Sequence, residues 1–172
     1  HEARELAEVY GVMAEAKAKS YSVFWAKADR KDETKIHRLV YHLIDVGQVA
    51  LAMWNKAIDV ESKRQFSQWL GYDEATAGRM LAYLISLHDL GKASPDFQIK
   101  VKSIAQEVAK AGFVFPKMKS PNPVAHGTVS ALSLKELLQN KLSLSKPDAK
   151  VLAQAIGGHH GTWIHPTDWQ AA

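Results

Sequence analysis

The sequence predicts an all-α fold, a compact bundle of helices. Two observations predict it. Apolar residues recur at steps of three and four along most of the chain, the spacing of a helix with one buried face, and no segment shows the sustained alternation of a strand. The composition is 47% hydrophobic and 23% charged, which is ordinary for a globular protein, and 172 residues correspond to about one domain.

The first predicted helix covers residues 2–19, which are rich in Ala, Glu and Lys. We take residues 1–20 as a helical extension and 21–172 as the main domain. A second helix is predicted from Lys35 to about Ile58. Its apolar residues fall at helical spacing, at Leu39, Leu43, Val46, Ala50, Met53 and Ala57.

A third helix is predicted from Asp73, a residue type that caps helix N-termini, to Gly91. A short helix follows over 101–111, and the prolines and glycine of 112–124 predict a loop. Two more helices are expected, over 125–140 and 147–156. The second begins at Pro147 and ends at Gly157-Gly158.

Composition excludes several kinds of chemistry. The chain has no cysteine, which excludes disulfides, thiolate nucleophiles and cysteine-bound zinc, and leaves its eight histidines as the strong nitrogen ligands. A formal charge of +4 is compatible with a nucleic-acid partner. We find no apolar run near the ~18 residues of a membrane span and no signal peptide, so we expect no membrane partner and a cytoplasmic location.

The histidines predict a metal centre. His42 lies within one predicted helix, and the pair His88-Asp89 lies near the end of the next. Because helices of a bundle converge side chains at a shared core, these residues can meet there. Imidazoles suit first-row transition metals, and one carboxylate can bridge two ions that together activate water for phosphoryl transfer. We therefore expect one or two divalent ions (Mn, Fe, Co, Ni or Zn) bound by His42, His88, Asp89, His126, His159 and His160.

Some neighbouring residues have plainer interpretations. We expect His1, His37 and His165 to be structural or surface residues, as single histidines commonly are. Asp45, one turn beyond His42, is expected to orient that imidazole from outside the ligand set. Lys92 either stabilises a helix C-terminus or contacts a substrate phosphate, and the sequence leaves both open.

The segments HLIDV, LHDLGKASPDFQIK, AHG and GGHHG resemble the HD superfamily of metal-dependent phosphohydrolases. More narrowly, they resemble the HD nuclease domain of the CRISPR-associated nuclease–helicase of type I systems. FWAKAD at 24–29 is similar to that family's Trp-x-Lys opening, with Ala26 where glycine is common. The Phe-Gln that follows the HD-x-Gly-Lys core and the double histidine of IGGHHG are its discriminating segments. The resemblance covers roughly Tyr21 to Trp163.

The resemblance implies a role for each matching residue. His42, His88 and Asp89 would bind a first metal, Asp89 would bridge to a second, and Asp89 and Lys92 would be the catalytic residues. The family degrades single-stranded DNA displaced by a Cascade surveillance complex. Its helicase motor follows the HD domain, and this chain has no G-x-x-x-x-G-K-[ST] phosphate loop, so the motor would act in cis or in trans. The family's downstream aspartate ligand has no clear match, because Asp168 is expected in a turn or cap.

Three functions remain open. A single-strand nuclease needs an open groove with basic and aromatic groups, whereas an HD phosphohydrolase for nucleotides or small phosphate esters needs a closed pocket. A non-catalytic docking domain would be expected to have lost ligands, and here all six are present. The candidate DNA-binding residues are Lys100, Lys102, Lys117, Lys119 and Trp163. These lysines could equally form a solvated face, and Trp163 could equally pack in the core.

Overall fold

A computed structural model describes residues 21–115, 123–161 and 163–170. The predicted helix over 2–19 and the lysines Lys117 and Lys119 lie outside this part. Helices dominate it, which confirms the predicted fold class, and none of the helices in these ranges is long and apolar enough to span a bilayer. In chain order the elements are β1 (Trp25–Ala28), β2 (Ile36–Arg38), α2 (Leu39–Lys56), α3 (Val60–Leu70), α4 (Glu74–Ser86), the 3-10 helix η1 (Leu87–Ala93), α5 (Pro95–Gln98), α6 (Lys102–Lys110), α7 (His126–Leu142), α8 (Lys146–Gly157) and α9 (Pro166–Gln170).

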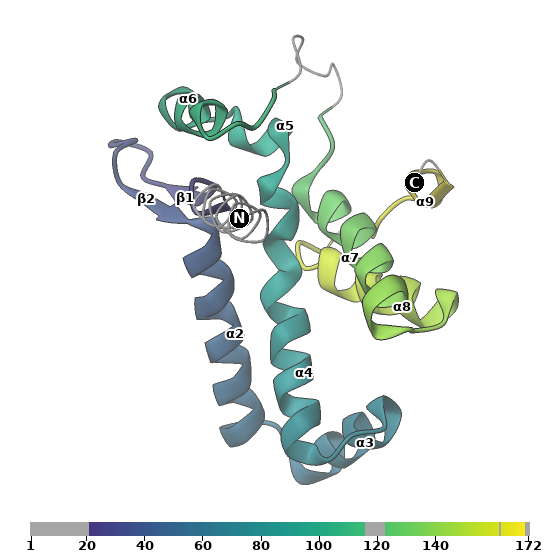
Figure 1. Cartoon of the computed structure of the whole chain (residues 1–172). Coiled ribbons are helices and arrows are strands. Elements are labelled where there is room, and N and C mark those ends of the chain that lie inside the picture. The colour runs from purple at the N-terminus through teal and green to yellow at the C-terminus, as the bar shows by residue number, and fades with distance from the viewer. Residues whose placement is uncertain (1–20, 116–122, 162, 171–172) are drawn as a thin grey trace, which may run out of the picture.

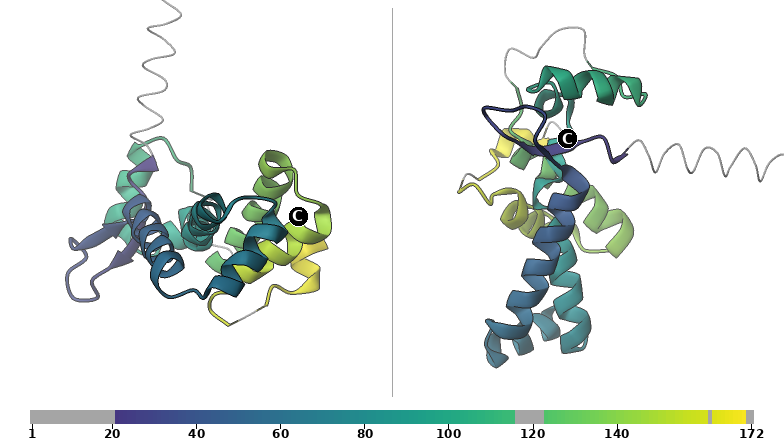
Figure 2. Two further views of the ribbon diagram at one scale, coloured as in Figure 1. Left: turned by 90° about the horizontal axis from the view of Figure 1, so that it is seen from below. Right: turned by 90° about the vertical axis from the view of Figure 1, so that its left-hand side faces the viewer.

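The long helices α2 and α4 lie side by side, and α3 connects them at one end (Figure 1). At the other end lie the two strands with α5 and α6. Helices α7 and α8 pack together beside η1, and the turned views of Figure 2 place them on the side away from the strands. The 3-10 helix η1 contacts α2, β1, α7 and α8. It therefore lies where all parts of the fold meet.

A β-hairpin precedes α2, which the sequence analysis missed. β1 and β2 pair antiparallel, with Trp25 opposite Arg38 and an irregularity between Trp25 and Lys27. Strands of four and three residues are too short to show alternation. The helix predicted from Lys35 begins instead at Leu39, because residues 36–38 pair with β1.

The helix α3 was also missed. Its N-cap is Asp59, whose side chain accepts a hydrogen bond from the Ser62 backbone N at 2.9 Å. None of its residues is buried, and only four of its eleven residues are apolar, which are Val60, Phe66, Trp69 and Leu70. Asp73 caps α4 as predicted, accepting from the Thr76 backbone N at 3.0 Å.

The predicted helix that ends at Gly91 changes its winding near the end. The α-helix stops at Ser86, and residues 87–93 continue as the 3-10 helix η1. Residues three apart eclipse one another in a 3-10 helix. Asp89 and Lys92 therefore project on the same side of η1.

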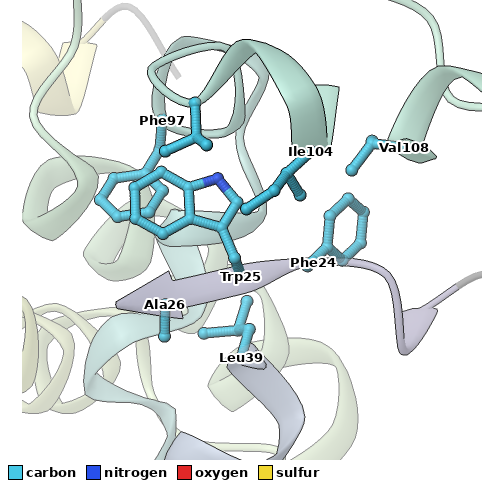
Figure 3. Close-up of a cluster of buried hydrophobic side chains, with 8 residues drawn as sticks. Phe24, Trp25, Ala26, Leu39, Phe97, Ile104 and Val108 are labelled. Atoms are coloured by element: carbon cyan, nitrogen blue, oxygen red, sulfur yellow. The ribbon is translucent and has the colours of Figure 1, made fainter. Parts of the chain in front are cut away.

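Two hydrophobic clusters hold the fold. One joins the hairpin to α2, α5 and α6, and Figure 3 shows Trp25 at its centre with Phe97 and Ile104 around the ring. The other joins α4, α7 and α8 through residues such as Leu84, Leu134 and Ile156. Since η1 contacts β1 and α5 on one side and α7 on the other, it is held between the two clusters.

Two glycines let α7 and α8 approach closely. A Cβ at Gly127 would lie 2.6 Å from the Gly157 carbonyl oxygen, and a Cβ at Gly157 would lie 2.6 Å from the Ala131 Cβ. Both distances are shorter than any van der Waals contact. These glycines therefore set the distance between the helix that begins at His126 and the helix that ends before His159.

We predict that Gly157→Ala lowers the free energy of unfolding by ~1–3 kcal/mol, the usual cost of overpacking. The sign of this change in the free energy of unfolding is informative, because Gly→Ala at an open helix position raises that free energy by up to about 1 kcal/mol. Urea unfolding followed by circular dichroism measures the change. A variant as stable as the wild type would contradict the close packing of α7 on α8.

Candidate metal centre

The carboxylate of Asp89 lies at the centre of the candidate site and is only 3% exposed. Its Oδ2 lies 2.8 Å from His42 Nε2 and 3.2 Å from His88 Nε2. The same oxygen lies 2.6 Å from Lys92 Nζ, as the eclipsed positions on η1 require. Three nitrogens, contributed by α2 and η1, therefore surround one oxygen.

The other oxygen of Asp89 faces the second half of the chain. Oδ1 lies 3.2 Å from His126 Nε2 and 3.4 Å from His159 Nε2. His160 Nε2 lies 2.9 Å from His126 Nε2. These three imidazoles come from the start of α7 and from the turn after α8, so the close packing of those helices brings them together.

The six residues proposed as ligands from the sequence thus fall into two groups that share Asp89. One group holds His42, His88 and Asp89, with ligand atoms all within 4.8 Å of one another. The other, equally close, consists of Asp89, His126, His159 and His160.

The ligand atoms of the second group are better placed to bind a metal ion than to form hydrogen bonds with one another. Oδ1 of Asp89 is buried and has no hydrogen-bond partner among the described residues, although two imidazole nitrogens lie within 3.4 Å. A buried carboxylate oxygen without a partner is costly. Three Nε2 atoms and one oxygen that converge in this way form the nitrogen–oxygen donor set that first-row divalent ions prefer.

Backbone carbonyls orient two of the imidazoles. His88 Nδ1 lies 3.2 Å from the Ile85 carbonyl oxygen, and His159 Nδ1 lies 3.0 Å from that of Ile156. A hydrogen bond donated from Nδ1 leaves the lone pair on Nε2, which faces Asp89. These two hydrogen bonds could not be predicted from the sequence, because both acceptors are backbone atoms three residues upstream.

Asp45 has a different partner from the expected one. Its Oδ2 lies 3.1 Å from Nε2 of His37, on the partly exposed side of α2, whereas His42 points to Asp89. Asp45 is three residues beyond His42 on α2, but the His42 side chain is directed into the fold. The hairpin places His37 within ion-pair distance of Asp45 instead. His37, expected to be a structural or surface residue, therefore pairs with the carboxylate that was expected to orient His42.

Burial sets the protonation states. It lowers the pKa of His126 to about 4, and it also lowers the pKa of His42 and of His159. These imidazoles are therefore neutral at pH 7, the form that binds metals. Burial alone would raise the pKa of the Asp89 carboxyl, but the contacts of this carboxylate with His88 and with the Lys92 ammonium outweigh burial and hold that pKa well below its usual range.

Gly91 brings η1 against α7. A Cβ at this position would lie 2.0 Å from the His126 carbonyl oxygen, and the Gly91 backbone N donates to the Ser130 Oγ at 2.8 Å. The sequence analysis interpreted Gly91 as a helix stop. Its effect in the fold is to place Asp89 beside His126.

Two of the candidate DNA-binding residues, Lys100 and Lys102, are exposed, whereas the candidate catalytic residue Lys92 is buried. Lys100 Nζ lies 4.7 Å from the centre of the Phe97 ring, which itself lies 5.5 Å from the His126 ring. Trp163 is 76% exposed and so is not a core residue. Asp168, expected in a turn or cap, lies instead within the helix α9, and its side chain is outside the described part.

The helical fold and this set of histidines and aspartate are those of a metal-binding HD domain. The chain belongs to the family of Cas3 HD domains, because the family model described as "Cas3, HD domain" matches residues 25–171.

Two curated relatives are named as CRISPR-associated endonuclease/helicase Cas3. The chain is 36% identical over 137 residues to the protein of Thermus thermophilus, covering 80% of this chain and 14% of that protein. It is 27% identical over 165 residues to the protein of Escherichia coli, covering 84% of this chain and 18% of that protein. The chain therefore spans less than a fifth of the length of these two relatives.

Solved structures of related proteins have the same fold. A crystal structure titled as a CRISPR-associated protein superposes with a TM-score of 0.76 at 33% identity, covering 86% of this chain and 16% of the other. That of T. fusca Cas3 with AMPPNP gives a TM-score of 0.69 at 28% identity, with coverages of 84% and 15%. A chain of a CRISPR RNA-guided surveillance complex before nicking gives 0.64 at 27% identity, with coverages of 83% and 17%.

The two groups predict two unequal metal affinities. We expect Mn²⁺ to bind more tightly to the four-residue group than to the three-residue group, because each added ligand stabilises the ion. His160→Ala should weaken the tighter binding step by at least about tenfold, a typical loss around a metal centre. His42→Ala should affect only the weaker step. Isothermal titration calorimetry of metal-free protein measures both.

The control is His165→Ala. This histidine lies outside both groups, with Nδ1 2.8 Å from Thr167 Oγ1. Its removal should leave both steps unchanged. Two equally tight steps in the wild type would contradict the assignment.

Proposed function

We propose that this chain is a metal-dependent nuclease domain that hydrolyses phosphodiester bonds of single-stranded DNA in CRISPR interference. The observation that carries the proposal is the sharing of Asp89. One oxygen faces His42 and His88, and the other faces His126 and His159.

The ligand set supports two divalent ions on either side of one carboxylate. Divalent ions held in this way activate water and neutralise phosphate charge during phosphodiester hydrolysis. The protein's own contribution is to keep the imidazoles neutral by burial and to keep Asp89 ionised among nitrogens. It also fixes Nε2 as the free nitrogen on His88 and His159 through their backbone hydrogen bonds.

Lys92 supports a substrate role at the same place. The residue is 9% exposed, and its ammonium lies 2.6 Å from Asp89 Oδ2. A lysine at a helix C-terminus that only complements the helix dipole is normally solvated. A buried ammonium beside the bridging carboxylate is positioned instead to meet a phosphate oxygen at the centre.

The openness of the second group favours a polymer over a small closed-in ester. His160 is exposed and the side chain of His159 is 22% exposed, so this side of the centre faces solvent. Lys100 lies over the Phe97 ring, which in turn lies 5.5 Å from the His126 ring, and supplies a cation. The exposed Trp163 follows His160 by three residues and supplies an aromatic surface. Exposed aromatic side chains stack on unpaired bases at ~1–3 kcal/mol per base, and lysines bind the backbone.

The comparisons support the partners. The curated relatives are named as endonuclease/helicases, and one similar structure is a chain of a surveillance complex. We therefore propose a helicase in cis or in trans and a Cascade surveillance complex as partners of this domain.

We predict that Asp89→Ala and Asp89→Asn both abolish cleavage of circular single-stranded DNA, at least about a hundredfold below wild type. Either change removes the charge shared by both groups, and neither replacement can bridge two ions. Gel assays with added Mn²⁺, and with EDTA as the metal-free condition, measure the rate.

Asp59→Asn is the matched control, because it lies at the α3 N-cap and keeps an accepting side chain there. It should cut at the wild-type rate. Normal cleavage by Asp89→Ala would contradict the shared-carboxylate centre. Cleavage of mononucleotide esters without cleavage of DNA would favour the small-ester phosphohydrolase instead.

We also predict a preference for single strands over blunt duplex of about tenfold or more. Trp163→Ala should raise the KM for single-stranded DNA by about tenfold, the loss of one stacked base. Lys92→Ala should likewise raise KM more than it lowers kcat. Steady-state cleavage of a fluorescent oligonucleotide, single-stranded or annealed, measures these constants. Equal rates on the two substrates would contradict the model.

A further inference from the structure

The side chain of Gln98 is fully buried, with 0% exposure, and its carboxamide is fully used. Nε2 donates to the Trp25 carbonyl at 2.9 Å and to the Lys92 carbonyl at 2.7 Å. Oε1 accepts from the Trp25 backbone N at 3.2 Å. One side chain thus joins strand β1 to the 3-10 helix that carries Asp89 and Lys92.

The carboxamide of Gln98 pairs with β1 as a neighbouring strand would. The N–H and C=O of a strand residue point to the same side. For Trp25 both bonds go to Gln98, which supplies an acceptor and a donor in the positions of a peptide group. A third bond, from Trp25 Nε1 to the Gln98 backbone oxygen at 3.3 Å, fixes the ring as well.

The contact reaches both halves of the metal centre. On one side, the Lys92 backbone is held while its Nζ lies 2.6 Å from Asp89 Oδ2. On the other, the adjacent Phe97 ring lies 4.6 Å from the Trp25 ring and 5.5 Å from the His126 ring. Among these contacting side chains, in the described part of the protein, only Gln98 hydrogen-bonds the backbone of Lys92.

We infer that Gln98 is a positioning residue that fixes the Lys92 backbone against strand β1 and so sets where the Lys92 ammonium meets Asp89. A buried polar side chain costs stability unless every polar atom is bonded. The amide at this position satisfies the backbone groups of Trp25 and also holds the Lys92 carbonyl, which an apolar side chain of the same size cannot do. The inference deepens the proposed metal centre and rests on it for its link to activity.

A double-mutant cycle in metal-free protein tests the inference. The variants are Gln98→Met, which keeps length and volume but removes the amide, Lys92→Met, and the double variant. If Gln98 acts through Lys92, its loss matters less once the ammonium is gone. We expect the double variant to be more stable than additivity predicts by about threefold or more in the unfolding equilibrium constant, as for residues in contact. Urea unfolding in EDTA measures it.

Gln154 offers a matched control, because its Oε1 accepts from Trp169 Nε1 at 3.1 Å, another buried-edge contact between a glutamine and a tryptophan. Gln154→Met combined with Lys92→Met should be additive. Additivity of the Gln98 cycle as well would overturn the inference and leave Gln98 a purely structural residue. If Gln98→Met does not fold, Gln98→Glu replaces it in the same cycle, because it keeps the acceptor for the Trp25 backbone N and loses both donated bonds.

Mn²⁺ affinity gives a second, independent sign. Removing a cation beside Oδ2 should strengthen Mn²⁺ binding, so we expect Lys92→Met to bind about tenfold more tightly. Gln98→Met should change the affinity in the same direction, whereas mere loosening of the fold would weaken it. Weaker binding by Gln98→Met would contradict the inference. Neither readout uses DNA, so a wild-type protein that fails to cut DNA would contradict the proposed function alone.

Discussion

An ionised carboxylate in a protein interior must be compensated, since leaving it without partners costs several kcal/mol. Asp89 is such a group, and the nitrogens around it come both from its own 3-10 helix and from segments distant in the sequence. Lys92 lies on the same 3-10 helix, His42 on α2, and His126 and His159 on the α7–α8 pair. The relative positions of these elements are therefore coupled through one side chain.

The backbone has features that allow this convergence. The change from α-helix to 3-10 helix after Ser86 aligns Asp89 with Lys92. Gly91 lets this helix touch the first turn of α7, and Gly127 and Gly157 let α7 touch α8. Each contact would be blocked by a single Cβ. The glycines of the HD-x-Gly-Lys and Gly-Gly-His-His segments are thus packing requirements of the centre rather than helix stops alone.

Chemistry and packing are divided between the two sides of η1. The side facing α7 and α8 opens to solvent at His160, where an extended substrate can approach. The side facing β1 is closed by Trp25, Phe97 and Gln98, which form part of a buried cluster. A buried inner wall and an open outer face are consistent with the proposed polymer substrate, which would approach the candidate centre from one side.

The sequence by itself determined the all-α class, the four helices predicted from Asp73 and over 101–111, 125–140 and 147–156, and the six residues that the fold brings together at the candidate metal centre. It could do so because helical periodicity is local and because histidine and aspartate at helix ends carry a specific chemistry. The β-hairpin, α3, α5 and α9 were not predicted. Elements of three to five residues are too short to show a period, and only four of the eleven residues of α3 are apolar.

The partner of each side chain was decided only by tertiary structure. Asp45 was expected to orient His42, but the hairpin brings His37 to it instead. The acceptors that orient His88 and His159 are backbone carbonyls, which carry no signature of residue type. Gln98 is similar, because its hydrogen bonds go to the backbone of residues 25 and 92. Sequence spacing fixes which residues share a helix, whereas contacts between elements depend on how closely the backbones approach, and that is settled by packing of the whole fold.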